Sequence, residues 1–156
     1  MEQYVFNSSM EAFDGTSWKA MTHRFVQVSL AAPFQSNINN AWVNIPGDSL
    51  SIIDTGFYIV VAETNLANLG GPCNSFNGKI EINKSSNDYY RPIAQAYFFD
   101  IVSQNAGFGH GMNNLVYMGI LNGGENIYAK VFYQTFSGSG CTWRVNASTI
   151  TAVRIQ

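Results

Sequence analysis

The last third of the chain constrains its fold most strongly, because strand-like runs alternate there with a glycine-rich turn. Two such runs, Leu115–Leu121 and Asn126–Gln134, flank the turn segment Asn122-Gly123-Gly124-Glu125. A further run, Ser148–Ile155, follows downstream. Short runs of strand-forming residues separated by glycine and asparagine predict antiparallel strands joined by tight turns.

The rest of the chain repeats this pattern, and no window sustains helical periodicity. We expect further strands at Phe25–Leu30, Trp42–Ile45, Ser51–Ala62, Gly78–Asn83 and Arg91–Val102. The turns between them carry Pro46-Gly47-Asp48 and Asp54-Thr55-Gly56, and glycine also marks the longer loops Asn65–Ser75 and Ser103–Asn113. The sequence therefore predicts an all-β antiparallel sandwich or jelly roll over residues 21–156, preceded by a separate segment at residues 1–20.

The composition is apolar but poor in charge. Of 156 residues, 46% are hydrophobic and 12% are charged, against about 25% charged residues in ordinary soluble domains. Eight basic and ten acidic residues are scattered without runs, so the chain lacks the basic stripe of a nucleic-acid-binding protein. Since interface cores are depleted of charge, we expect part of the surface to be covered by other subunits. A surface rich in amides and hydroxyls is the alternative.

Membrane insertion is not expected, because no apolar run approaches the ~20 residues that a spanning helix needs. The segment Met1-Glu2-Gln3-Tyr4 has an acidic residue where a secretory signal carries basic ones. We expect either synthesis in the cytoplasm or a signal that was removed.

Residues suited to catalysis or metal binding are sparse. The two histidines, His23 and His110, do not lie at metal-ligand spacing with a cysteine, and neither Cys73 nor Cys141 lies in a nucleophile motif. Cys73 and Cys141 either form a disulfide with each other or remain two free thiols. We predict no enzyme, no cofactor and no metal.

Three segments resemble the trimeric jelly roll shared by the C1q globular domain and the tumour necrosis factor ligands. Gly56–Val60 is similar to the family's Gly-x-Tyr strand, Leu121–Ile127 to its turn between two late strands, and Ser148–Val153 to its last strand. Ala152 stands where the family often has glycine, and no collagen-like stalk precedes the domain. The resemblance implies a jelly-roll homotrimer.

The run Ile127–Gln134 carries large residues on both faces, whereas a strand of a lone sandwich buries only one. Ile127, Ala129, Val131 and Tyr133 form one face. On the other face we predict that Tyr128, Lys130 and Phe132 contact neighbouring subunits, because aromatic residues concentrate in interface cores. The alternative is that the aromatic residues are ordinary surface residues or lie beneath a loop.

Aromatic and basic residues outside this run are candidates for partner binding. The predicted partner- or glycan-binding loop residues are Tyr89, Tyr90, Arg91, Phe108, Trp143 and Arg144. Packing within a loop is the alternative for Trp143. In residues 1–20 we predict an arm that anchors the protein to a capsid or a neighbouring protein through Tyr4, Phe6, Phe13 and Trp18.

These features favour a virion protein over other classes. Jelly-roll trimers occur in head fibres, spikes and capsid decorations, and the scarce charge fits such a role. We therefore predict a non-enzymatic, homotrimeric virion component that binds other virion proteins and a host receptor or glycan. A secreted C1q-like ligand or lectin module is the alternative.

Overall fold

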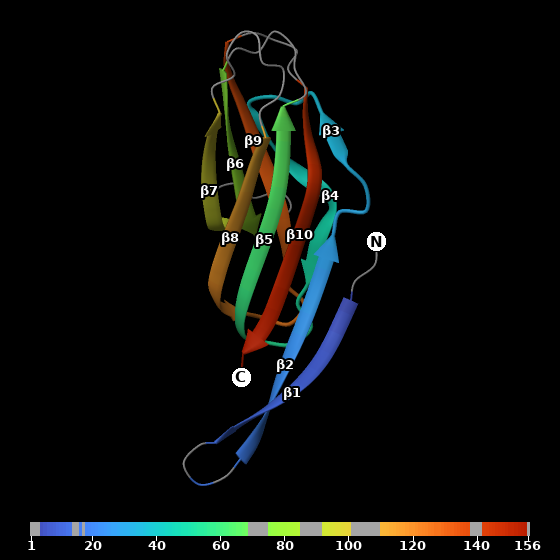
Figure 1. Ribbon diagram of the computed structural model, residues 1–156, viewed down its shortest axis with the longest axis vertical. Coiled ribbons are helices and arrows are strands. Elements are labelled where there is room, and N and C mark those ends of the chain that lie inside the picture. Colours follow the sequence, from blue (N-terminus) through green and yellow to red (C-terminus); the bar gives the residue numbers. More distant parts are fainter. Residues whose placement is uncertain are drawn as a thin grey trace.

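The computed structural model describes residues 4–13, 16, 18–68, 75–84, 92–100, 110–137 and 142–155. In residues 4–13, 18–24, 68, 75–77, 95–100, 110–113 and 135–137 the description covers the backbone alone. Ten strands lie within this part of the chain (Figure 1): β1 (Tyr4–Phe13), β2 (Trp18–Ser29), β3 (Phe34–Ser36), β4 (Ala41–Ser51), β5 (Gly56–Asn68), β6 (Ser75–Asn83), β7 (Pro92–Asp100), β8 (His110–Leu121), β9 (Asn126–Ser137) and β10 (Trp143–Ile155).

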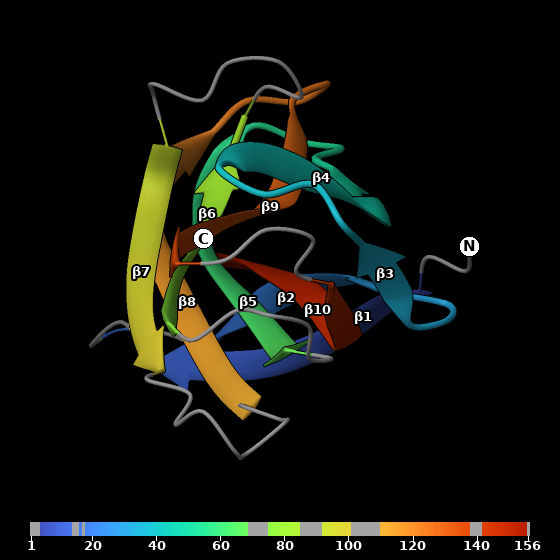
Figure 2. The ribbon, with the colours of Figure 1, turned by 90° about the horizontal axis from the view of Figure 1, so that it is seen from above.

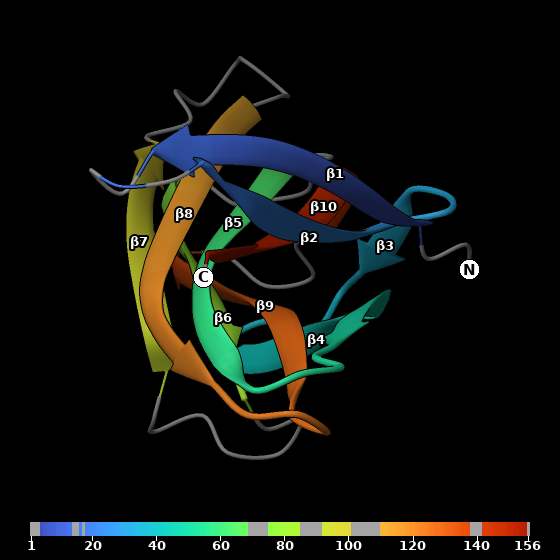
Figure 3. The same cartoon turned by 90° about the horizontal axis from the view of Figure 1, so that it is seen from below.

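The strands form two antiparallel sheets that face one another (Figures 2 and 3). The first sheet has the order β1-β2-β10-β5-β8, and β3 also pairs with β10. The second sheet has the order β4-β9-β6-β7. Apart from the consecutive pairs β1–β2 and β6–β7, neighbouring strands in each sheet are not consecutive in the sequence, so the chain crosses repeatedly between the layers. The predicted all-β, two-sheet sandwich is confirmed.

Alternation along the strands builds the core between the sheets. In the first sheet Val60 and Ile150 are buried, and in the second sheet Ile80, Ile82 and Val131 are buried opposite them. The strand predicted at Gly78–Asn83 is therefore confirmed, with Ile80 and Ile82 on its inward face. Burying such a side chain contributes about 1.5–3 kcal/mol, so this shared layer stabilises the sandwich.

Two predicted boundaries around β4 and β5 are wrong. We expected Pro46-Gly47-Asp48 to end a strand, but β4 continues to Ser51 through an irregularity between Asn44 and Ser49. Gly47 adopts a φ of 76° within it, a conformation that glycine adopts without strain. Ser51–Ala62 is not one strand either, because β4 ends at Ser51 and β5 begins at Gly56.

The start of β10 also differs from the prediction. Trp143 and Arg144 were assigned to a loop, but they are the first residues of β10 and pair with β3 and β5. The indole N–H of Trp143 donates a 2.8 Å hydrogen bond to the carbonyl of Ile38. The ring stacks on Tyr133 of the other sheet at a centroid distance of 5.9 Å. This buried aromatic pair holds the sheets together near one end.

Candidate functional site: an uncovered apolar face

Large apolar side chains gather on the outward face of the first sheet. Val116, Met118 and Ile120 of β8 are 58%, 60% and 65% exposed, and Phe57 of β5 is 44% exposed. Their neighbours along the same strands, Leu115, Leu121 and Tyr58, are buried between the sheets. Strand alternation therefore places one apolar set in the core and the other in solvent.

The register joins these residues into rows that cross the sheet. In one row, Met118 of β8, Ile59 of β5, Val153 of β10 and Phe25 of β2 are successive cross-strand partners. In another, Ile120 of β8, Phe57 of β5 and Ile155 of β10 are successive partners. Ile59, Val153, Phe25 and Ile155 are half-buried. We call this outward surface of β2, β10, β5 and β8 the first-sheet face. Cross-strand neighbours lie about 4.5–5.5 Å apart, so the rows form one continuous apolar surface.

Contiguous exposed apolar surface of this kind marks a contact site in soluble proteins. The second sheet covers only the opposite side of these strands (Figures 2 and 3). Polar groups lie toward the other end of the face, where one row holds Gln27 and Thr151 and the next holds Ser29, Thr149, Glu63 and Asn114, so the rows of Met118 and Ile120 offer little to orient a small molecule. Its chemistry suits another apolar protein surface.

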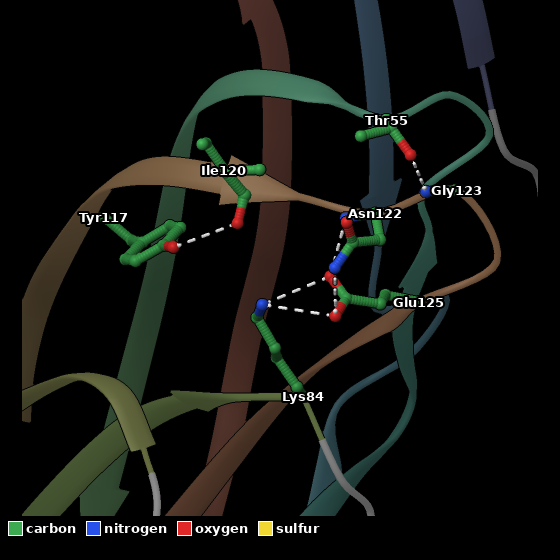
Figure 4. A network of polar contacts seen from close by, with 7 residues as sticks. All are labelled: Thr55, Lys84, Tyr117, Ile120, Asn122, Gly123 and Glu125. Carbon is green, nitrogen blue, oxygen red and sulfur yellow. Dashed lines mark hydrogen bonds and ion pairs between the residues drawn. The ribbon is translucent and has the colours of Figure 1, made fainter.

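A docked turn holds one end of this face in place (Figure 4). The turn between β8 and β9 closes with a 3.1 Å hydrogen bond from the Glu125 N–H to the Asn122 carbonyl. Gly124 adopts a φ of 86°, which favours glycine. A side chain at Gly123 would approach the Ile53 carbonyl oxygen to 2.7 Å. The two glycines therefore allow the turn to lie directly against the β4–β5 connection.

The Glu125 carboxylate fastens this turn. It accepts a 2.8 Å hydrogen bond from the Asn122 N–H and lies 3.2 Å from the Lys84 ammonium. Burial by itself raises the pKa of Glu125. The hydrogen bonds from Asn122 and the positive charge of Lys84 lower it by more, so the pKa lies below its ordinary value. Glu125 therefore caps the backbone amide of Asn122 within the turn.

Arg154 joins the end of β10 to the β4–β5 turn. Its guanidinium donates to the Thr55 carbonyl at 2.8 Å and lies 3.9 Å from the Asp54 carboxylate. The Thr55 hydroxyl accepts a 3.0 Å hydrogen bond from the Gly123 N–H. Both turns and the last strand are thereby fixed beside Phe57 and Ile120.

The predicted interface residues of β9 lie on the outward face of the second sheet. Tyr128 and Phe132 are half-buried, and the Phe132 ring lies 5.4 Å from that of Trp42. Lys130 is fully buried within the protomer, with Glu81 directly opposite it on β6 and also buried. Lys130 therefore offers no surface to a neighbour. Contacts made by Tyr128 and Phe132 stay a prediction.

The other predicted binding residues are placed as follows. Trp143 is fully buried, so its ring is not available to a ligand at the surface, and Arg144 is half-buried. The remaining loop residues, Tyr89, Tyr90, Arg91 and Phe108, lie outside the described residues, as do Cys73 and Cys141. In the predicted arm, Tyr4, Phe6 and Phe13 belong to β1 and Trp18 begins β2.

A buried polar cluster links the sheets. The Ser148 hydroxyl of β10 donates to the Asp48 carboxylate of β4 and lies 3.2 Å from the Thr64 hydroxyl of β5. Burial raises the pKa of Asp48 to about 6, against the opposing effect of the Ser148 hydrogen bond. All three residues are buried, and the cluster joins β4 of the second sheet to β5 and β10 of the first.

Other kinds of site are scarce in the described part of the chain. Within the described ranges, no group of three or more His, Cys, Asp or Glu side chains is placed to hold a metal ion. No helix among the described residues is long and apolar enough to span a membrane. An open pocket of about 360 Å³ lies beside β3, lined mainly by apolar side chains including Leu30, Pro33 and Phe34.

The first-sheet face was missed at the sequence level, although a signal was present. Leu115–Leu121 carries large apolar residues at both odd and even positions, as Ile127–Gln134 does. The presence of large residues on both faces predicted an interface at Ile127–Gln134, and the same pattern holds for Leu115–Leu121. Phe57–Ala62 of β5 is likewise apolar at every position, but only the face with Tyr58, Val60 and Ala62 is buried.

Comparison with known proteins supports the fold. The structure of Eiger TNF from S. frugiperda matches with a TM-score of 0.53 at 10% sequence identity, covering 85% of this chain and 93% of that one. The chain has a TNF-like jelly-roll fold. The resemblance inferred from the sequence is thereby confirmed at the level of fold.

The other comparisons are weaker or negative. The structure of the infectious bursal disease virus Gx strain matches with a TM-score of 0.48 at 9% identity, over 92% of this chain and 36% of that one. No protein-family model matches the sequence. A search of curated proteins also found no match.

Proposed function

We propose that this TNF-like jelly roll is a non-enzymatic assembly module that forms a homotrimer through its first-sheet face. The main observation in its favour is the set of exposed apolar residues on β8 and β5, of which Ile120, Met118 and Val116 are the most exposed. Jelly rolls of this type typically trimerise, with each protomer covered by its two neighbours. A neighbour seated on this face would remove these side chains from water, at about 25 cal/mol per Å² buried.

The larger role that we propose is that of a virion structural component, such as a head fibre, spike or capsid decoration. The support is compositional: only 12% of the residues are charged. The trimer would contact capsid or other virion proteins and a host-surface receptor or glycan. Arg144 and the loop residues Tyr89, Tyr90, Arg91 and Phe108 stay the candidates for the latter contact.

A secreted ligand is the second candidate, favoured by the similarity to the insect tumour necrosis factor. Its trimer would bind a receptor in place of a capsid. A disulfide between Cys73 and Cys141 would favour this alternative, since disulfides persist in oxidising compartments.

Two experiments test the proposal. Sedimentation equilibrium of the purified protein should give three times the 17.2 kDa chain mass, and a monomer would refute the trimer. Mass spectrometry of purified virus particles should then detect the chain in fixed stoichiometry to the capsid protein. A trimer that is absent from particles but binds a cell-surface receptor would support the secreted alternative.

A further inference from the structure

The β1–β2 hairpin extends beyond the sheet to which it belongs. β10 pairs with β2 only from Arg24 to Ser29. β1 pairs with β2 further, through six more positions from Ser8↔His23 to Phe13↔Trp18. At about 3.4 Å per residue, this two-stranded ribbon projects roughly 20 Å past the last β10 partner. Figure 1 shows it extending below the sandwich and past the C-terminal end of β10.

A projecting ribbon of two strands is not expected to be stable alone. Isolated two-stranded hairpins are marginal in water, and stability requires a third strand or a covering surface. β1 is moreover the edge strand of the first sheet, hydrogen-bonded on one side by β2. Among the described strands none pairs with the other edge of β1, and an edge strand of this length presents unpaired backbone groups to which another chain can pair.

The register connects the ribbon to the first-sheet face. Phe6 pairs with Phe25, and Phe25 lies in the same row as Val153 and Ile59. The register positions two, four and six residues along the ribbon, Ser8↔His23, Met10↔Met21 and Ala12↔Lys19, belong to this same face because a strand alternates with a period of two. The register positions of the first-sheet face therefore continue onto the ribbon, where the methionine pair lies between Ser8↔His23 and Ala12↔Lys19.

We propose that the ribbons of the three copies pack on one another and extend the trimer interface beyond the sandwiches. The occupant of the Met10↔Met21 face is thus the same segment of a second copy. This inference rests on the proposed homotrimer. Continuity with the first-sheet face supports it, because a neighbour that covers Phe25 and Val153 lies beside the base of the ribbon. Methionine is enriched at interfaces and adapts to irregular contacts.

Cross-linking tests this contact directly. In protein with Cys73→Ser and Cys141→Ser, the single substitution Met21→Cys should give covalent dimers with a short bis-maleimide. Its sequence neighbour Thr22→Cys lies on the other register face of the same strand and is the matched control. We expect at least fivefold more cross-linked product for Met21→Cys than for Thr22→Cys.

Charge substitution in the protein with its native cysteines gives an independent test. Met10→Glu with Met21→Glu should raise the trimer dissociation constant at least tenfold. Ser9→Glu with Thr22→Glu, another directly paired position on the opposite face, should change it less than twofold. Sedimentation equilibrium measures both.

The outcomes separate this inference from the proposed function. If the unmodified protein is a trimer but neither cross-linking nor charge distinguishes the two faces, the ribbon contact is refuted and the sandwich trimer stands. The same result would point to a capsid or other virion protein as the partner of the ribbon. If the unmodified protein is a monomer, both proposals fail.

Discussion

The outward faces of both sheets carry large side chains, but the two faces differ in how far the protomer itself buries those side chains. On the second sheet, Tyr128 and Phe132 flank Lys130, which is fully buried opposite Glu81 without help from another chain. On the first sheet, Val116, Met118 and Ile120 remain more than half exposed. One face is thus largely completed within the protomer and the other is not. Large residues on both sides of a strand do not by themselves identify an interface. The apolar surface that the folded protomer leaves exposed is the better indicator.

The largest expected effect comes from charging the uncovered face. Met118→Glu with Ile120→Glu places two carboxylates in the proposed contact, and we expect the trimer dissociation constant to rise at least a thousandfold, about 4 kcal/mol. Sedimentation equilibrium gives the constant. Ile38→Glu is the control, because Ile38 is 50% exposed away from this face. An equal effect of Ile38→Glu would remove the distinction between the faces.

The second face should respond in stability rather than in assembly. Lys130→Met leaves Glu81 buried without the opposite charge beside it, which costs about 3 kcal/mol of unfolding free energy. Lys79→Met on β6, half-buried beside the Phe132 ring, should cost less than about 1 kcal/mol. Urea denaturation at fixed protein concentration measures both. A Lys130→Met protein that folds normally but dissociates would instead support the predicted β9 interface.

The sequence pattern predicted the two-sheet sandwich better than it predicted which outward sheet face stays exposed in the protomer. Alternation of Ile80 and Ile82 and the turn at Gly123-Gly124 depend on local chemistry, and both were predictable. Pro46-Gly47-Asp48 has the composition of a turn, yet cross-strand pairing carries β4 through it. The burial of Lys130 depends on residues of β6 that are distant in the sequence, so β9 alone could not reveal it.

Asp48 is buried between the two sheets, so replacing it should affect the stability of the protomer without affecting trimer assembly. Its folded pKa of about 6 exceeds the ordinary value of 3.8, so the folded state holds the proton more tightly than the unfolded state. The resulting stability is fully present below pH 3.8 and is lost as the pH rises through 6. Asp48→Asn should therefore raise the unfolding free energy at pH 7 by roughly 2–3 kcal/mol, at 1.36 kcal/mol per pKa unit.

The measurement is urea denaturation at pH 4 and pH 7, comparing Asp48→Asn with the unmodified protein. The difference in stability between the two proteins should shrink as the pH falls. A difference that is constant with pH would show that Asp48 does not titrate in this range. Ser51→Ala, at an exposed position on the same strand, is the control and should show no such pH dependence.

The smallest effect is expected at the turn beside the first-sheet face. Gly124→Ala introduces a side chain where φ is 86° and no atom lies within 4 Å, so the cost is backbone strain alone, about 1 kcal/mol. Thermal unfolding should show a modest loss of stability, and the trimer dissociation constant should stay within about threefold. A large loss of assembly would mean that the turn itself contacts the neighbouring copy.

The native mass of the unmodified protein tests the central claim most directly. Sedimentation equilibrium over nanomolar to micromolar concentrations should give a species of three chains of 17.2 kDa each that persists on dilution to the low micromolar range and dissociates only below it. A single 17.2 kDa species throughout that range, with Ile120 and Met118 replaceable by glutamate at no change in mass or solubility, would contradict the account.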